Sequence, residues 1–491
     1  MKLNTSSRRS AEFTGRPEDE KLPAGQLVAY GAQHILTMYG GVIAPPLIVG
    51  GAAGLSGSDM ALLVTAGLFI SGLATLLQTL GLGPFGARLP IVQGISFASV
   101  STMVAIASKD GLQPVFGSIL VAGLIGLLVS SFFAQLVRLF PPVVTGTIIT
   151  VIGISLLPVS FTWAMGGAGA PDLGSTANIG LAGLTLLIIL VISRLFQGAL
   201  SRLSILLGIV VGTGIAAIFG KADFSGIGTG KMVALPPLLH FGGPTFQVGA
   251  IVSMTIVILV IMTETTADIL AIGEIVETKV DARRVANGLR ADMLSTAIAP
   301  FFGSFPASAF AQNVGLVAIT KIKSRYVVAV GGLILVVLGL LPVVGRVVAS
   351  IPFPVLGGAG IVLFGSVTAS GIRTLSRVRY DDNLNLVLVA TAIGIGLIPV
   401  AAPTFWDKFP DSVGVVLDSG ISAAAIAAVL MNVFFNEITI GNKPGASVFA
   451  AGSSEYDGAA PLAVDPEVVD RPADADLSTP TTTGTRKADH V

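Results

Sequence analysis

The sequence predicts an all-α, polytopic membrane protein of about fourteen transmembrane segments, arranged as two inverted repeats of seven. Three observations lead to this fold class: an apolar composition, an alternation of basic residues between segments, and a pattern that recurs in the second half of the chain. Of 491 residues, 53% are hydrophobic and 11% are charged, whereas roughly a quarter of a soluble domain is charged. This composition leaves too little polar surface to cover a soluble globule.

Charge and cysteine content exclude several functional classes. The formal net charge is +0, so no overall field favours nucleic acid as a partner. The chain has no Cys, which excludes disulfides, thiolate metal sites and cysteine nucleophiles and leaves the redox compartment undetermined. No His, Asp and Glu cluster falls within one apolar segment, so neither a metal, a cofactor nor an enzymatic function is expected.

Both ends of the chain are polar. Residues 1–24 contain no apolar stretch and therefore differ from a signal peptide. Residues 441–491 are rich in Thr, Asp and Pro, which is typical of disorder. We expect both to be cytoplasmic tails.

Apolar stretches punctuated by Gly and Pro define the fourteen candidate segments. The third and tenth are short and interrupted by glycine, so we expect extended breaks there. The segments are expected to begin near Gln26, Met60, Ile91, Pro114, Val143, Ile179, Leu203, Val248, Val285, Ala307, Tyr326, Pro354, Asn383 and Val413.

The distribution of Lys and Arg between these segments supports the count. With a cytoplasmic N-terminus, the inner loops hold about fourteen basic residues and the outer loops about five. Cytoplasmic loops of membrane proteins carry such an excess. An even number of segments in the inner membrane, with both termini cytoplasmic, follows from this alternation.

Two patterns recur at an offset of roughly 212–217 residues. Pro142 in Phe140–Gly146 matches Pro354 in Phe353–Gly358, and Phe85-Gly86 with Pro90 matches Phe302-Gly303 with Pro306. Chance matches in an apolar sequence are the alternative. Because seven segments per repeat is an odd number, the second repeat must be inverted in the membrane. Inverted repeats are typical of alternating-access transporters, which bind substrate where discontinuous helices meet.

Ionisable side chains inside the segments are the first candidates for a functional site. Glu264 and Asp268 are four residues apart and share a helix face. Asp292 and His34 lie in the ninth and first segments. A polar contact between packed helices is the structural alternative for each of them.

The polar residues at the two breaks suit a planar heterocycle with several N–H and C=O groups. A carboxylate accepts from ring N–H groups, and a carboxamide both donates and accepts. Backbone groups freed at a helix break add further partners. The candidates at these breaks are Ser96, Phe97, Phe310, Ala311, Gln312 and Asn313, and the two Phe rings would stack on the ligand.

The stretch from Gln312 to Lys321 resembles the signature of the nucleobase–ascorbate transporter family, also called nucleobase:cation symporter-2. All its fixed positions match: Gln, Asn, any residue, Gly, four of any residue, Thr and a basic residue. Gln33-His34 and the stretch from Glu264 to Glu274 also resemble the family. The resemblance covers about residues 25–440.

The resemblance implies a domain plan and residue roles. Segments 1–4 and 8–11 would form a core domain (25–138 and 223–345), and segments 5–7 and 12–14 a gate domain (139–222 and 346–440). Gate domains would pair in a homodimer while the core moves like an elevator. Glu264 and Gln312 would bind the substrate beside Phe97, Ser96, Phe310 and Ala311, and the polar network would comprise His34, Asp268, Asp292 and Asn313.

The resemblance also implies the cargo: a purine base, urate or xanthine, carried with H⁺. Gln312 favours purines, because uracil carriers tend to have Glu there, and the small Ser96 favours urate. Ser308 and Ala309 depart from common family patterns. A carboxylate partly removed from water retains a proton more readily, which would couple proton and substrate. A uracil or other nucleobase permease, an anion exchanger of the same fold, and an uncoupled channel remain alternatives.

Overall fold

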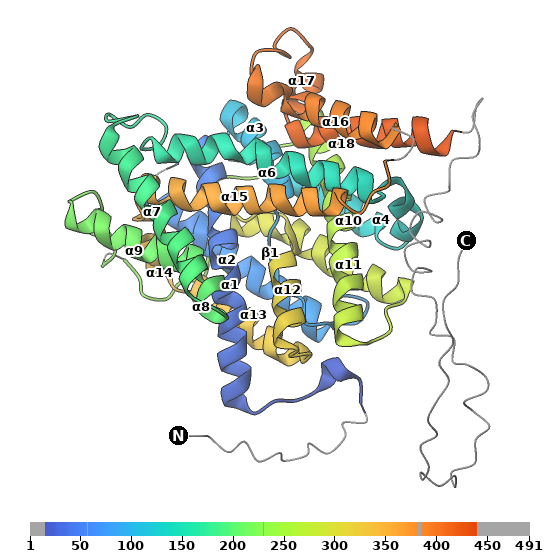
Figure 1. Ribbon diagram of the computed structural model, residues 1–491, viewed down its shortest axis with the longest axis horizontal. Helices are drawn as coiled ribbons and strands as arrows, with labels where there is room; N and C mark the ends of the chain where they lie inside the picture. Colours follow the sequence, from blue (N-terminus) through green and yellow to red (C-terminus); the bar gives the residue numbers. More distant parts are fainter. Residues whose placement is uncertain (1–14, 56, 229, 381–383, 439–491) are drawn as a thin grey trace, which may run out of the picture. The chain divides into compact units, whose positions relative to one another are not determined.

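The computed structural model describes residues 15–438, except 56, 229 and 381–383 (Figure 1). The expected C-terminal tail, 441–491, lies outside the described residues. Of the expected N-terminal tail, residues 15–23 are described, and they include the short helix η1 (Pro17–Asp19).

The first half of the chain forms long helices with one extended break. Its short helices are η2 (Phe97–Ser99), α5 (Phe133–Leu136), η3 (Val137–Leu139) and α8 (Ala199–Arg202). Its other elements are α1 (Ala24–Ala52), α2 (Gly57–Leu80), β1 (Gln93–Ile95), α3 (Val100–Asp110), α4 (Leu112–Val129), α6 (Pro142–Ala164), α7 (Thr176–Leu195) and α9 (Ser204–Ile218).

The second half repeats this order, again with one extended break. Its short elements are η4 (Ala299–Phe302), α14 (Pro342–Ala349), α17 (Asp411–Leu417) and η5 (Val433–Glu437). Its other elements are α10 (Val248–Val276), α11 (Ala282–Ile298), β2 (Ala307–Ala309), α12 (Ala311–Thr320), α13 (Arg325–Gly339), α15 (Phe353–Leu375), α16 (Leu384–Ala401) and α18 (Gly420–Asn432).

Every predicted segment start lies within about three residues of a helix or strand start. The last prediction, Val413, falls on the short α17, and the long apolar helix α18 begins at Gly420. The side chain of Ser419 accepts a hydrogen bond from the backbone N–H of Ser422 and starts this new helix, which the hydropathy pattern did not separate from α17.

The described helices make the chain a multi-pass membrane protein. Nine are long and apolar enough to cross a membrane, or ten if the bent pair α13 and α14 is one span. The five shorter helices that match the remaining predicted segments are α3, α9, α11, α12 and α13. The structure therefore confirms an all-helical, polytopic protein, and the predicted fourteen crossings exceed what helix length alone supports.

The two predicted extended breaks meet at the centre of the helices. Strand β1 pairs antiparallel with β2, and Gly94 lies opposite Ser308, 214 residues further along the chain. Beside this pair, the N–H of Ser96 donates to Pro306 O and the N–H of Phe310 donates to Val92 O. These two bonds exchange under a two-fold rotation about the Gly94–Ser308 pair. Their separation matches the repeat offset in the sequence, and such a pairing is what an inverted repeat requires.

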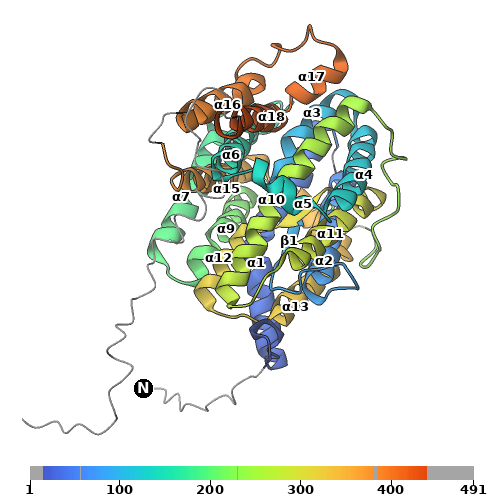
Figure 2. The same ribbon diagram turned by 90° about the vertical axis from the view of Figure 1, so that its right-hand side faces the viewer.

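Glycines allow the corresponding helices of the two halves to pack closely. Helices α6 and α15 lie side by side and antiparallel (Figures 1 and 2). A Cβ at Gly153 would lie 2.4 Å from the backbone N of Thr368, and one at Gly371 would lie 2.4 Å from that of Thr150. Around this pair, α16 and α18 form an adjacent layer (Figure 2). Only 17% of the apolar window of α16 and 28% of that of α7 is buried, so both present apolar side chains outward.

Candidate functional site

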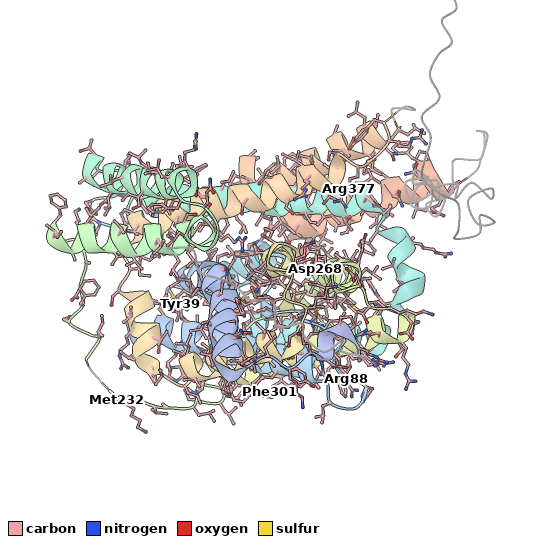
Figure 3. The ribbon with its side chains drawn as sticks, turned by 60° about the horizontal axis from the view of Figure 1, so that its bottom comes forward. Tyr39, Arg88, Met232, Asp268, Phe301 and Arg377 are labelled. Carbon is pink, nitrogen blue, oxygen red and sulfur yellow. The ribbon has the colours of Figure 1, made fainter. Side chains whose placement is uncertain are left out.

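A cavity of about 420 Å³ lies where the two extended breaks face α10, α6 and α15. Small-molecule sites commonly have volumes of about 300–1,000 Å³. Asp268, one of its lining residues, lies inside the helical bundle (Figure 3). Seven predicted site residues line this single cavity: Ser96, Phe97, Glu264, Asp268, Phe310, Ala311 and Gln312.

Two carboxylates of α10 face the cavity. Glu264 and Asp268 are one helical turn apart, as predicted, and both line it. Within the described residues neither carboxylate has a hydrogen-bond or ion-pair partner. Acceptor groups left open in a cavity are available to a ligand that carries N–H groups or to a proton.

Two helix N-termini converge on the same cavity. Residue Phe310 is extended and α12 begins at Ala311, so the first N–H groups of this helix have no intrahelical acceptor. Ser96 plays the equivalent part for η2, where its hydroxyl accepts from the N–H of Ala98. The free N–H groups and the helix dipole at the start of α12 favour a carbonyl or anionic oxygen there. The side chain of Gln312 is exposed to the cavity.

The two predicted aromatic residues differ in their surroundings. Phe310 is 4% exposed, and its ring is 6.4 Å from that of Phe97. It lies against Gly41 and Gly94, because a Cβ there would lie 2.6 and 2.3 Å from its ring atoms. Phe97 is half-buried and packs edge-on against Phe364 at 6.1 Å. Phe310 is thus fixed in place, and Phe97 is the aromatic residue with surface left for a ligand.

His34 and Asn313 form a pair outside the cavity. The side-chain amide of Asn313 donates to Nδ1 of His34 at 2.9 Å and to its backbone O at 3.3 Å. A carbonyl only accepts, so the amide nitrogen of Asn313, and not its oxygen, faces His34, and Nδ1 must also accept. This leaves the ring proton of a neutral His34 on Nε2. The pair ties α1 to the first turn of α12, next to Gln312.

Asp292 also lies away from the cavity and is fully buried. It accepts hydrogen bonds from Thr265 Oγ1 at 2.7 Å and Gln78 Nε2 at 3.4 Å. The Thr265 hydroxyl oxygen in turn accepts from the N–H of Ala309 in β2. Asp292 therefore orients the residue that follows Glu264 and supports the strand at the cavity.

The wall formed by α15 was not predicted from the sequence. Ser366, Ser370 and Thr374 line the cavity opposite α10. Their spacing of four residues places three hydroxyl groups on one helix face, a signal that was present in the sequence. Ile149 and Ile152 of α6 complete this wall and carry no sequence signal that separates them from other apolar residues.

A hydrogen-bonded cluster outside this cavity joins α3 and α10 to α18. Thr102 lies 2.6 Å from Ser419, and Ser253 lies 2.9 Å from Ser422, measured between hydroxyl oxygens. All four side chains are fully buried. Beyond them, Lys109 forms an ion pair with Asp418 at 2.6 Å.

Comparisons with known proteins agree on one family. The family model described as the Permease family, which represents xanthine and uracil permeases, matches residues 25–405. The uric acid transporter UacT of Escherichia coli is 41% identical over 87% of this chain and 90% of its own length. The xanthine permease and the uric acid permease PucK of Bacillus subtilis are each 39% identical, over 84% and 85% of this chain and 94% and 97% of their own lengths.

Solved structures with the same fold are more distant in sequence. The transmembrane domain of a cyanobacterial bicarbonate transporter, BicA, is similar with a TM-score of 0.58 and 19% identity, over 84% of this chain and all of that domain. SLC26A9 gives a TM-score of 0.59 and 12% identity, over 85% of this chain and 67% of its own. At these identities the likeness shows the fold alone.

Proposed function

Because the chain belongs to the xanthine/uracil permease family, nucleobase:cation symporter-2, we propose that it imports a purine base in symport with protons. The proposed cargo is urate or xanthine. Relatives about 40% identical are named as uric acid and xanthine permeases.

One observation carries this proposal: the unpaired carboxylate of Glu264 lines the same cavity as the amide of Gln312 and two helix N-termini. A purine dione or trione has ring N–H groups for a carboxylate and exocyclic oxygens for backbone N–H groups. Gln312 would pair with one N–H and C=O edge of the ring. Phe97 would stack on the ring face.

The cavity also suits urate within this class. Ser96 is small and lines the cavity at the start of η2. An extra C8 oxygen would fit beside it and accept from its hydroxyl. Ser366, Ser370 and Thr374 provide further donors on the opposite wall.

Glu264 and Asp268 are the groups of this cavity that can take up and release a proton. Neither has a basic partner within the described residues. If one carboxylate is protonated when the purine binds and deprotonated when it leaves, proton and substrate are coupled by linkage. His34 and Asn313 hold the Gln312 turn, and Asp292 holds Thr265, so they position the site without contacting the ligand.

The proposed mechanism is elevator-type alternating access across fourteen segments. Residues 25–138 and 223–345 would form the moving core, and 139–222 and 346–440 the gate. The cavity lies between core elements α10 and α12 and gate elements α6 and α15. It extends along α15 to Thr374, near the end that the basic residues predict to be cytoplasmic. In this proposal the conformation would be inward-facing, with both termini inside. The outward apolar faces of α7 and α16 would contact lipid and, in a homodimer formed by the gate domains, the partner subunit.

The test is uptake of radiolabelled urate, xanthine and uracil by cells that lack their own carriers, with and without an uncoupler. Uncoupler-sensitive accumulation of urate or xanthine is expected. Glu264→Gln should abolish accumulation, whereas Glu274→Gln, an exposed change in the same helix, should leave it unchanged. Normal accumulation by Glu264→Gln would refute the role of this carboxylate.

The same experiment separates the alternatives. Accumulation of uracil alone would show that the substrate is a pyrimidine base and not a purine. Purine uptake that only equilibrates and ignores the uncoupler would replace symport by facilitated transport. If well-expressed protein takes up no base, the alternative that it is an anion exchanger of the same fold should be tested next.

A further inference from the structure

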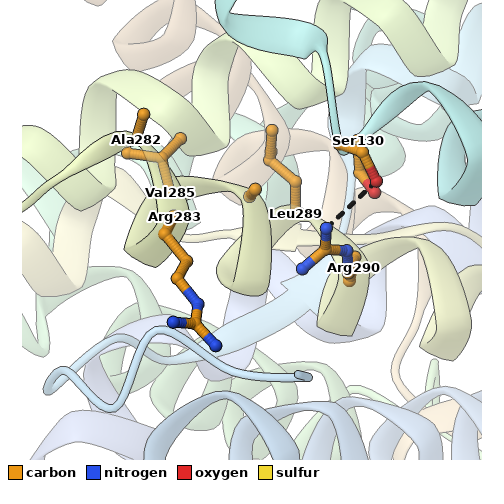
Figure 4. A pocket seen from close by; sticks show the side chains of 8 residues that line it. Ser130, Ala282, Arg283, Val285, Leu289 and Arg290 are labelled. Carbon is orange, nitrogen blue, oxygen red and sulfur yellow. Dashed lines mark hydrogen bonds between the residues drawn. The ribbon is translucent and has the colours of Figure 1, made fainter.

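A second cavity of about 230 Å³ lies between the first turns of α11 and the end of α4, away from the purine site. It is lined by Arg283, Arg290, Ser130 and Ser131, together with apolar side chains of α11 that include Val285 and Leu289 (Figure 4). The basic residues of this segment belong to the side predicted to be cytoplasmic. The cavity therefore lies at a membrane–water interface.

The two arginines have unused donor groups. Arg290 donates to Asn287 at 2.7 Å and to the hydroxyl of Ser131 at 3.0 Å, which leaves three of its five N–H groups free. Arg283 has no partner within the described residues. Their neighbour Arg284 is different, because it is paired with Glu18 at 2.5 Å. No acidic side chain neutralises either of the two arginines in the described part of the chain, so their cavity attracts an anion.

Exposed apolar side chains on the part of the chain that flanks Ser130 and Ser131 indicate what carries the anion. At the same end of α4, Leu124 is 48% exposed and Leu128 is 73% exposed, and Phe132 just beyond is 49% exposed. In a protein that crosses the membrane, this ridge faces acyl chains. A free anion would use the arginines and serines alone, whereas a phospholipid would use the ridge as well.

We propose that this cavity binds the phosphate headgroup of an anionic phospholipid, with the acyl chains lying along Leu124 and Leu128 of α4. Guanidinium groups pair with phosphate oxygens through charge-assisted hydrogen bonds, and serine hydroxyls add donors. Ser130 and Ser131 begin the connection from α4 to α6, which joins the proposed core and gate. A lipid held there stabilises this joint on its core side.

The test uses the full-length protein, purified in detergent and titrated with phosphatidylglycerol or phosphatidylcholine, with bound lipid counted by native mass spectrometry. Phosphatidylglycerol should bind to the wild type more tightly than phosphatidylcholine. Arg283→Gln should weaken phosphatidylglycerol binding about fivefold, since a basic residue near a lipid surface contributes about a factor of five. Arg194→Gln removes an exposed arginine on the same predicted side and should change nothing.

Two further measurements keep the result interpretable. Arg283→Lys keeps the charge and should bind within about twofold of the wild type, and the thermal midpoint of each variant reports on folding. If inorganic phosphate at millimolar concentration displaces the phosphatidylglycerol, the site is a phosphate site and the lipid assignment fails. Equal binding by wild type and Arg283→Gln, or equal affinity for both lipids, would also overturn it.

Discussion

The hydroxyl oxygen of Thr102 in α3 lies 2.6 Å from that of Ser419, the residue that caps α18. Together with Ser253 of α10 and Ser422 it forms a fully buried cluster that joins α3 and α10 to α18. In the proposed elevator, α3 and α10 belong to the moving core and α18 to the gate. In that proposal the cluster would be the closed outer contact of an inward-facing carrier, and its hydrogen bonds would have to break when the core moves.

Removing the Thr102 hydroxyl should shift the carrier toward the outward-facing state. A buried hydrogen bond contributes about 1 kcal/mol, or roughly fivefold in the equilibrium. The chain has no Cys, so a single cysteine can report on the cavity without background. In inside-out vesicles, Ser366→Cys, which lines the cavity, should react with an impermeant thiol reagent more slowly once Thr102→Val is added.

The matched control for this change is Thr147→Val. Its hydroxyl is also fully buried but bonds only to Val143 O in its own helix. It should leave the labelling rate of Ser366→Cys unaltered. If both valine variants slow the labelling equally, the cause is the loss of a buried hydroxyl within a helix and not the loss of the contact between Thr102 and Ser419.

Breaking the ion pair between Lys109 and Asp418 should also shift the carrier toward the outward-facing state, by a smaller amount than Thr102→Val. Their side chains are 51% and 15% exposed, and exposed pairs contribute about 0.2–1 kcal/mol. We expect Lys109→Asp to slow labelling of Ser366→Cys by about twofold at low salt and less at high salt. Exchange of the two charges, Lys109→Asp with Asp418→Lys, should restore the rate, and failure to do so would argue against a direct pair.

Gly94→Ala should reduce urate transport more than xanthine transport. A Cβ at Gly94 would lie 2.3 Å from the Phe310 ring, which cannot move toward α1 because Gly41 leaves no space there. The ring must therefore move toward Phe97 and narrow the cavity, at a cost of about 1–3 kcal/mol. Competition of unlabelled urate and xanthine against labelled xanthine measures the shift in preference.

The control for that experiment is Gly365→Ala in α15, where an added Cβ meets nothing within 4 Å. It should preserve the ratio of the two affinities. A proportional loss of both purines in Gly94→Ala would mean that the strand pair is damaged and that cavity size is not the cause.

The sequence predicted the elements well because hydropathy and proline act locally, and because the repeat places corresponding elements at one constant offset. Pro142 and Pro354 mark helix starts from their own backbone restrictions. The pairing of Gly94 with Ser308 agreed with an offset that was already visible in the sequence. The break between α17 and α18 escaped prediction because a serine cap leaves the hydropathy almost unchanged.

The candidate site was predicted in part for a similar reason. Charged and amide residues such as Glu264 and Gln312 stand out in an apolar segment, and both line the cavity. Whether a polar side chain faces the cavity or a neighbouring helix depends on tertiary packing, so sequence alone did not place Asp292 against Thr265 or His34 against Asn313. The hydroxyl wall of α15 was missed because Ser and Thr are common in transmembrane helices.

Glu18 should be the residue before α1 that contributes most to stability. Its carboxylate is 1% exposed and accepts from Arg284 at 2.5 Å and from Thr278 at 3.1 Å. Glu18→Gln removes the charge while Arg284 keeps its bonds to backbone carbonyls. We therefore expect a loss of about 1–3 kcal/mol, seen as a lower thermal midpoint of the purified protein. Asp19→Asn breaks a more exposed pair, 37% exposed at the carboxylate, and should cost under about 1 kcal/mol. Equal decreases in the thermal midpoint for the two changes would show that the burial of Glu18 adds nothing to the stability that its ion pair provides.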